Sequence, residues 1–171
     1  MDVRVMFDRE WKGKIISSFD EDREISLDEL KQVLCFPFHP DTQLIVFELE
    51  GHFGDFGLKP FAMKDSYYFV DTDASNTPLY QTSFDEFSFG FSAYDYLDEV
   101  NQMSPDEIGE LDNLAIDCLC EWFADLSQEV GGDSPIACMI QIHDTMGVYL
   151  LQERKWLTEE EFKDYFETKE N

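Results

Sequence analysis

A chain of 171 residues in which 43% of the side chains are apolar can bury a sizeable core, and its length is usual for one domain. The formal charge of −26, from 38 acidic and 12 basic side chains, disfavours direct binding to nucleic acid, to anionic membranes and to anionic substrates. The sixteen Phe side chains argue against an intrinsically disordered chain. We therefore expect residues 1–171 to form a single folded domain.

The N-terminal third predicts strands followed by a short helix. Residues 3–7 and 12–19 have the pattern of strands. Residues 26–34 favour a helix, because Ser26 and Glu29 have the spacing of a capping box and the leucines that follow share one face. Proline cannot continue a helix, so the prolines after this segment are expected to end it.

The N-terminus lacks the apolar run of a signal peptide, and no later apolar run approaches the length of a membrane helix. We therefore expect a cytoplasmic protein. The cysteines have neither the density nor the spacing of a disulfide framework. In a reducing compartment all four are expected to be small apolar core residues: Cys35, Cys118, Cys120 and Cys138.

The middle of the chain predicts further strands. Residues 42–50 are rich in β-branched and aromatic side chains, which favours a buried strand, and the glycines of residues 51–57 indicate a loop. In residues 84–92, Phe side chains alternate with small polar residues, as in a strand with one apolar face. Other strands are expected over residues 58–64, 66–73 and 79–84, with a turn at 74–78.

The last third predicts helices around one hairpin. A short helix is expected within residues 93–103 and a long one over 104–130. Residues 135–144 and 146–153 suggest a hairpin, and a terminal helix follows from Thr158, which has Glu161 at capping-box spacing. This order favours an α+β fold, in which a largely antiparallel sheet has helices packed on one face.

The long helix has the clearest pattern in the chain. Ser104 and Glu107 form a capping box, Pro105 occupies the first helical position, and glycine follows the last turn. Apolar residues recur every three or four positions and predict one buried stripe. Its members are Ile108, Leu111, Ala115, Cys118, Leu119, Trp122 and Leu126.

The opposite side of the same helix carries a stripe of carboxylates. Its members are Asp106, Glu110, Asp117, Glu121 and Asp125. Members four residues apart are separated by about 6 Å along the axis, and like charges at this spacing destabilise a helix by ~0.2–0.5 kcal/mol per pair. Residues 65–153 contain nineteen Asp and Glu but no Lys or Arg, so no counter-charge is expected nearby in the sequence.

Three hypotheses account for this charge. The first is a protein-binding module that occludes a basic partner, such as an inhibitor or immunity protein seated on a nuclease toxin, or more broadly a mimic of nucleic-acid phosphates. The second is a merely solvated acidic surface. The third is an enzyme or metal-binding domain, for instance one acting on a neutral substrate. The size, acidity and α+β composition are similar to those of many bacterial immunity proteins, a resemblance that involves no particular residues.

We favour the first hypothesis, in which the five helix acids steer and pair with the Lys or Arg of a basic protein. Aromatic side chains supply most of the hot spots in protein interfaces, and several lie near acids in residues 84–96. The candidate anchors are Phe84, Phe87, Tyr94 and Tyr96. The oligomeric state is open, and direct nucleic-acid or membrane binding is not expected.

The motifs for catalysis or metal binding are weak. Residues 71–82 begin like a calcium loop but have Asn76 in place of the turn glycine and Thr82 in place of the bidentate glutamate. Cys138 and His143 have an odd spacing, which places them on opposite faces of a regular strand, and His143 is interpreted as part of a turn. We therefore expect no enzyme activity, no cofactor and no metal site.

Overall fold

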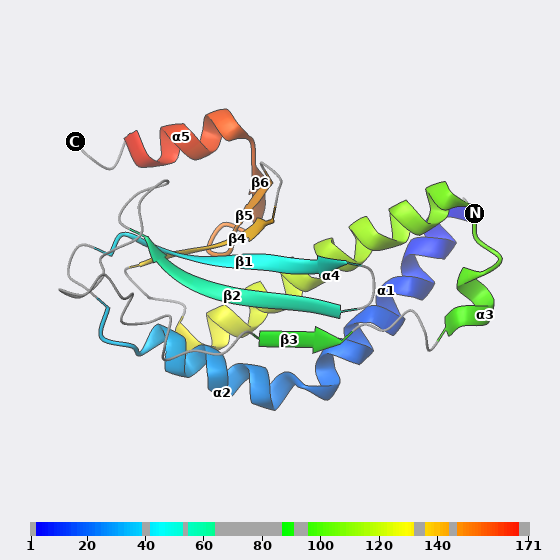
Figure 1. Cartoon of the computed structure of the whole chain (residues 1–171), viewed down its shortest axis with the longest axis horizontal. Helices are drawn as coiled ribbons and strands as arrows, with labels where there is room; N and C mark the ends of the chain where they lie inside the picture. The colour runs from blue at the N-terminus through cyan, green and yellow to red at the C-terminus, as the bar shows by residue number, and fades with distance from the viewer. Residues whose placement is uncertain are drawn as a thin grey trace.

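The computed structural model of the chain describes residues 3–38, 42–52, 55–63, 87–90, 96–131, 136–143 and 147–167 (Figure 1). Its elements are, in chain order, α1 (Val3–Glu21), α2 (Arg23–Leu34), β1 (Leu44–His52), β2 (Asp55–Met63), β3 (Phe87–Gly90), α3 (Leu97–Val100), α4 (Pro105–Gly131), β4 (Ala137–Ile142), β5 (Val148–Leu150), β6 (Lys155–Leu157) and α5 (Glu159–Glu167). Helices and one mixed sheet within a single chain confirm the α+β class.

Among the described residues, six strands form one sheet in the order β3-β2-β1-β4-β5-β6. Only β1 and β4 are parallel, and every other neighbouring pair is antiparallel, as the sequence predicted for most of the sheet. The long helix α4 connects β3, at one edge, to β4 in the middle, and it passes behind β1 and β2 in Figure 1. This crossover makes β1 and β4 end at the same side of the sheet.

The two faces of the sheet are covered differently. Ile45, Phe47 and Leu49 enter the main core with buried residues of α1, α2 and α4, whereas Leu44 and Val46 belong to a second apolar cluster on the other face. Phe162 of α5 packs against this second cluster. The expectation that the helices pack on one face is therefore not confirmed, because α5 covers the face opposite to α4.

The main core is built around α4. The ring of Phe123 packs edge-on against Phe47 of β1 at 4.9 Å between centroids, and Trp122 lies 5.6 Å from Phe19 of α1. The α4 residues facing the sheet and those facing α1 and α2 are both buried, including Cys120, which lies off the predicted stripe. The buried surface of α4 is therefore wider than a single stripe.

The two N-terminal strands that the sequence predicted are wrong, because residues 3–21 form α1. Trp11, Ile15 and Phe19 recur every four residues and are all buried, which is the period of a helix that packs one face on a partner. β-branched neighbours and Gly13 obscure this period in the sequence. Gly13 itself has open space around its Cα.

The capping box predicted at Ser26 is also wrong. The helix α2 begins three residues earlier, with Asp22 at its N-cap, and Ser26 is a buried position inside it. The predicted leucines do face the core, and the helix ends at Leu34 ahead of the prolines, as expected. Tertiary contact with α4 therefore extends this helix beyond its local signal.

The loop predicted over residues 51–57 is mostly strand. β1 and β2 form a long antiparallel ladder whose last pair is His52 with Asp55, so the reversal needs very few residues. Gly51, with φ of 109°, and Gly57 lie within the strands. The glycines of this segment therefore mark a tight hairpin.

The capping boxes of α4 and α5 are confirmed. The Ser104 amide donates to Glu107 Oε2 at 2.7 Å and the Glu107 amide donates to Ser104 Oγ at 3.3 Å. Thr158 and Glu161 exchange equivalent bonds of 2.8 and 3.2 Å. The hairpin of β4 and β5 and the strand β3 also form as predicted. The strands expected over 66–73 and 79–84, the turn between them and the calcium-like segment lie outside the described residues.

Candidate acidic and aromatic groove

The carboxylate stripe of α4 lies on the molecular surface, as its spacing predicts. All five members are exposed: Asp106, Glu110, Asp117, Glu121 and Asp125. The stripe is exposed because the rest of the helix circumference is used for packing on the sheet and on α1 and α2. The C-terminal half of the stripe, from Asp117 onward, runs between α1 and the strands β5 and β6.

This C-terminal half is partly neutralised by one distant cation. Arg154, in the turn between β5 and β6, places Nη2 at 2.5 Å from Asp125 Oδ1 and Nη1 at 3.6 Å from Glu121 Oε2. The hydrogen bond to Asp125 raises the pKa of the guanidinium above its ordinary value. The helix has no counter-charge nearby in the sequence, as expected, but the fold supplies a distant one to Glu121 and Asp125.

Two aromatic side chains are held beside the stripe by its carboxylates. Trp156 donates its indole N–H to Asp117 Oδ1 at 3.0 Å, and Tyr149 donates its hydroxyl to Glu121 Oε1 at 2.7 Å. The two rings pack edge to face at 5.2 Å. Burial, followed by the bond to Glu121, raises the pKa of Tyr149, so the phenol stays protonated at neutral pH. Trp156 is 37% exposed, which is unusual for so large an apolar side chain.

These groups line two adjoining hollows, which we call the α4 groove. Both hollows include Lys12 of α1 and Glu121. The first continues to Asp117, Tyr149, Arg154, Lys155 and Trp156, and the second to Asp20, Arg23, Trp122 and Asp125. The groove thus combines four carboxylates, four cations and an exposed indole.

Of the four predicted aromatic anchors, only Tyr96 has a described side chain, and it does not line the α4 groove. Tyr96 is half-buried at the far end of the molecule, where its ring meets Trp11 edge-on at 5.5 Å and the Lys14 ammonium lies 4.9 Å from its centroid. Phe87 lies in β3, and its side chain is not among those described. Phe84 and Tyr94 lie outside the described residues. Trp156 and Tyr149, which are hydrogen-bonded to carboxylates of the stripe, had no signal in the sequence spacing.

The buried thiols are structural. Burial raises the pKa of Cys118 to about 11 and that of Cys138 to about 12, and it raises the pKa of Cys120 further still. A protonated thiol is a poor nucleophile and metal ligand. Cys35, in contrast, is exposed, so the expectation that all four cysteines are core residues is wrong for that one. Cys138 and His143 lie on opposite faces of the sheet, as their spacing predicts.

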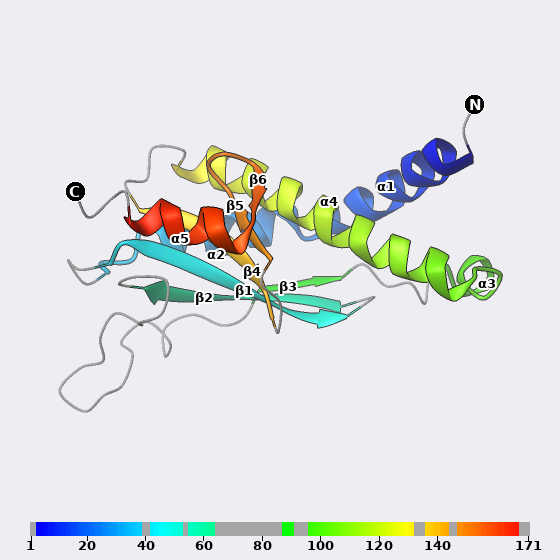
Figure 2. The same ribbon diagram turned by 90° about the horizontal axis from the view of Figure 1, so that it is seen from above.

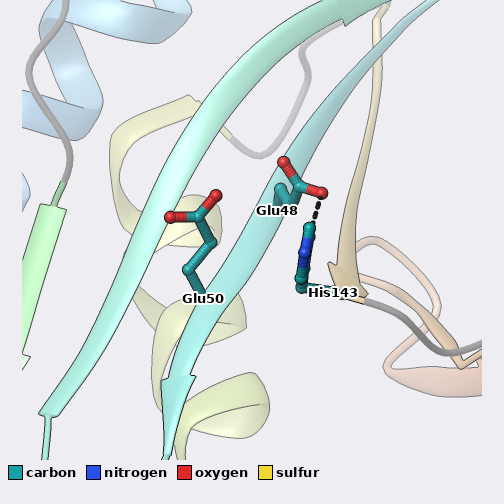
Figure 3. A group of neighbouring side chains, drawn as sticks. All are labelled: Glu48, Glu50 and His143. Atoms are coloured by element: carbon teal, nitrogen blue, oxygen red, sulfur yellow. Dashed lines mark hydrogen bonds and ion pairs between the residues drawn. The ribbon is translucent and has the colours of Figure 1, made fainter.

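A second group of polar side chains lies on the sheet itself. Glu48 and Glu50 of β1 and His143, just after β4, bring one ligand atom each within 4.8 Å of one another (Figure 3). His143 Nδ1 is 2.8 Å from Glu48 Oε1. The sequence interpretation of His143 as part of a turn missed this group, because it forms only when β1 and β4 pair.

No family model, curated protein or solved structure matches this chain, so any function must be argued from its own residues. Among the described residues, none of the helices combines the length and the apolar composition needed to cross a bilayer.

Proposed function

We propose that this protein is a binding module that occludes a basic protein partner, most specifically as an inhibitor or immunity protein of a toxin such as a nuclease. The observation that carries the proposal is the exposed, hydrogen-bonded Trp156 in a groove bordered by the α4 carboxylates. Interface hot spots combine a rigid aromatic anchor with surrounding polar groups, and here the anchor is held by a hydrogen bond to Asp117 and by the ring of Tyr149.

Charge supports the same proposal at longer range. The net charge of −26 accelerates encounter with a basic surface and repels nucleic acid and other acidic proteins. At the N-terminal half of α4, Asp106, Glu107 and Glu110 are exposed next to Asp98 and Glu99 of α3. This end supplies steering charge, while the groove supplies the aromatic contact.

The arrangement favours a shaped protein partner over general nucleic-acid mimicry. A duplex presents a phosphate every ~3.4 Å along each strand, whereas the α4 carboxylates recur every 6 Å or more and Arg154 neutralises part of the stripe. An aromatic ring also has no counterpart on a phosphate backbone. We therefore place the inhibitor version ahead of the mimic.

The test is capture from a lysate of the source organism at low and high salt, followed by association kinetics with each captured protein. The variants Trp156→Ala and Asp106→Asn/Glu110→Gln probe the anchor and the steering charge. The matched control, Glu24→Gln/Glu160→Gln, removes two exposed charges from α2 and α5. We expect the Asp106/Glu110 variant to associate about tenfold more slowly with a weaker salt dependence, and Trp156→Ala to dissociate faster.

The control variant is expected to associate at nearly the wild-type rate. If the control and the Asp106/Glu110 variant slow association equally, and Trp156→Ala has no effect, the capture reflects net charge alone and the proposed interface is wrong. Circular dichroism and thermal unfolding of each variant establish that the fold is retained.

A further inference from the structure

Strand alternation brings two carboxylates and an imidazole to one face of the sheet. On β1 the even-numbered residues Leu44 and Val46 belong to the second apolar cluster, and Glu48 and Glu50 continue that face toward the end of the strand. On β4, Ala137 and Met139 belong to the same cluster, and His143 lies on this face beyond them. The three polar side chains therefore extend one surface past its apolar part.

The parallel pairing of β1 with β4 fixes their positions. The His143 amide donates to the Leu49 carbonyl at 3.0 Å, which continues the ladder one residue beyond β4. Its imidazole is thereby directed to Glu48, as the dashed line in Figure 3 shows. The helix α5 lies over the beginning of β1 in both views, away from this end (Figure 2). The carboxyl ends of parallel strands are a common place for ligand sites.

The carboxylates of Glu48 and Glu50 create a negative charge that favours a bound cation. Glu48 and Glu50 are half-buried carboxylates two residues apart on one face of a strand, so a cation bound between them would be attracted by both. Lys59 is paired with Glu48 in the β1–β2 register, yet its ammonium lies 5.6 Å from the centroid of the Phe61 ring. Glu50 faces Gly57 across the same ladder, so β2 places no side chain opposite that carboxylate.

The donor set selects the kind of cation. One imidazole nitrogen and two carboxylate oxygens suit Zn²⁺ and similar divalent transition metals, whereas Ca²⁺ and Mg²⁺ prefer oxygen ligands alone. Ligand atoms of a tetrahedral zinc ion lie about 3.4 Å apart, given metal–ligand distances of ~2.1 Å. The three ligand atoms, which lie within 4.8 Å of one another, would have to adopt this spacing around an ion, and Gly57 places no side chain opposite Glu50.

We propose that Glu48, Glu50 and His143 form a binding site for one divalent transition-metal ion, with Zn²⁺ as the representative. Three protein ligands leave at least one coordination position for water or for a group of another molecule. The site is on the opposite face of the sheet from the α4 groove, so its loss need not affect partner binding.

The first experiment titrates the full chain with Co²⁺ and then Zn²⁺ in 0.5 M NaCl, where diffuse counterion binding to an acidic surface is screened. Co²⁺ with four or five N and O ligands absorbs visible light much more strongly than the aqueous ion. We expect one Co²⁺ per chain, a strong visible band, and its displacement by one equivalent of Zn²⁺ but not by Mg²⁺. A chain that shows no band, or a band removed equally well by Mg²⁺, would overturn the proposal.

The second experiment identifies the ligands. Glu48→Gln, Glu50→Gln and His143→Asn are each expected to weaken Zn²⁺ binding more than tenfold, measured by competition with a chromophoric chelator. Asp106→Asn removes an exposed acid far from the site and is expected to leave the affinity within twofold. Equal affinities for wild type, His143→Asn and Asp106→Asn would exclude the site, even if the protein binds metal elsewhere.

A folding control keeps the result interpretable. Zn²⁺ bound to the folded chain raises the midpoint of thermal unfolding in proportion to the logarithm of its free concentration. We expect this rise for wild type and for Asp106→Asn, and its loss in His143→Asn, whose midpoint without metal stays close to that of wild type. An equal rise of the unfolding midpoint in wild type, Asp106→Asn and His143→Asn would show that the ion binds other groups and would overturn the proposal.

Discussion

At the scale of single residues, Arg154 had no signal in the sequence, yet it forms ion pairs with two carboxylates of the groove. Its backbone has φ of 53°, a left-handed conformation that usually favours glycine. Such a conformation in a non-glycine residue costs on the order of 1 kcal/mol. The ion pairs of the Arg154 guanidinium with Glu121 and Asp125 offset the cost of this backbone conformation.

Arg154→Ala is expected to lower the free energy of unfolding by about 1 kcal/mol, because the loss of two exposed ion pairs leaves neighbouring carboxylates unscreened. Arg154→Gly should lose less, since glycine relieves the left-handed backbone. Urea unfolding at low salt measures both. Lys31→Ala is the control, because Lys31 pairs with Asp28 one turn away on its own helix and should cost only a few tenths of a kcal/mol. An Arg154→Ala loss no larger than that of Lys31→Ala would contradict this role.

At the scale of elements, helix termini decide where α4 and α5 begin. The backbone amide of Ser104 and its hydroxyl both donate to Glu107, and these bonds, the backbone one first, hold the pKa of Glu107 below its ordinary value of 4.5. A carboxylate whose pKa is lowered by folding stabilises the protein above its unfolded pKa. That contribution is lost as the pH falls through the folded pKa.

Ser104→Ala is therefore expected to destabilise the protein by about 1 kcal/mol at pH 7, as for other N-cap serines. The difference between wild type and Ser104→Ala should shrink as the pH falls below 4.5, because Glu107 becomes protonated in both. Chemical unfolding from pH 7 to pH 3 measures this convergence. Ser17→Ala, at an exposed position inside α1, should be neutral or slightly stabilising at every pH. A constant difference across the pH range would assign the Ser104 effect to the bond from the Glu107 amide to Ser104 Oγ and not to the Glu107 carboxylate.

At the scale of the whole molecule, repulsion among the acids opposes folding. The described cations are largely engaged in pairs within the chain, such as Lys14 with Glu99 and Arg23 with Glu129. The 12 bases of the sequence can balance only part of its 38 acids, which leaves the net charge of −26. Self-repulsion of this kind destabilises the compact state and is screened by salt. Screening also weakens the ion pairs, but the acids outnumber the bases by 38 to 12.

Raising NaCl from about 10 mM to about 0.5 M is expected to increase the thermal midpoint by several degrees at pH 7, because the Debye length falls from ~30 Å to about 4 Å. The same titration at pH 4, where many carboxylates carry a proton, should give a much smaller increase. Differential scanning calorimetry provides both measurements. A midpoint that falls with salt at pH 7 would mean that ion pairs dominate over repulsion.

Local sequence patterns were sufficient to predict a structural feature where the residues that determine it lie close together in the sequence. The capping boxes at Ser104 and Thr158, the buried and exposed sides of α4, and the strand β1 all follow from spacing that the sequence displays. The same reasoning failed at α1, where helical spacing of Trp11, Ile15 and Phe19 competes with strand-like neighbours. Packing against α4 decides that competition.

By itself, then, the sequence determined the α+β class, the charge, and which side of α4 faces water, because composition and a period of 3.6 residues are local properties. Only the tertiary structure decided what lies beside that exposed side. Arg154 and Trp156 reach Asp125 and Asp117 from 29 and 39 residues away. His143 likewise meets Glu48 across 95 residues, because α4 returns the chain to pair β4 with β1. Contacts that depend on strand register and on the crossover leave no short-range signal, so the groove and the group of Glu48, Glu50 and His143 are found only in the folded chain.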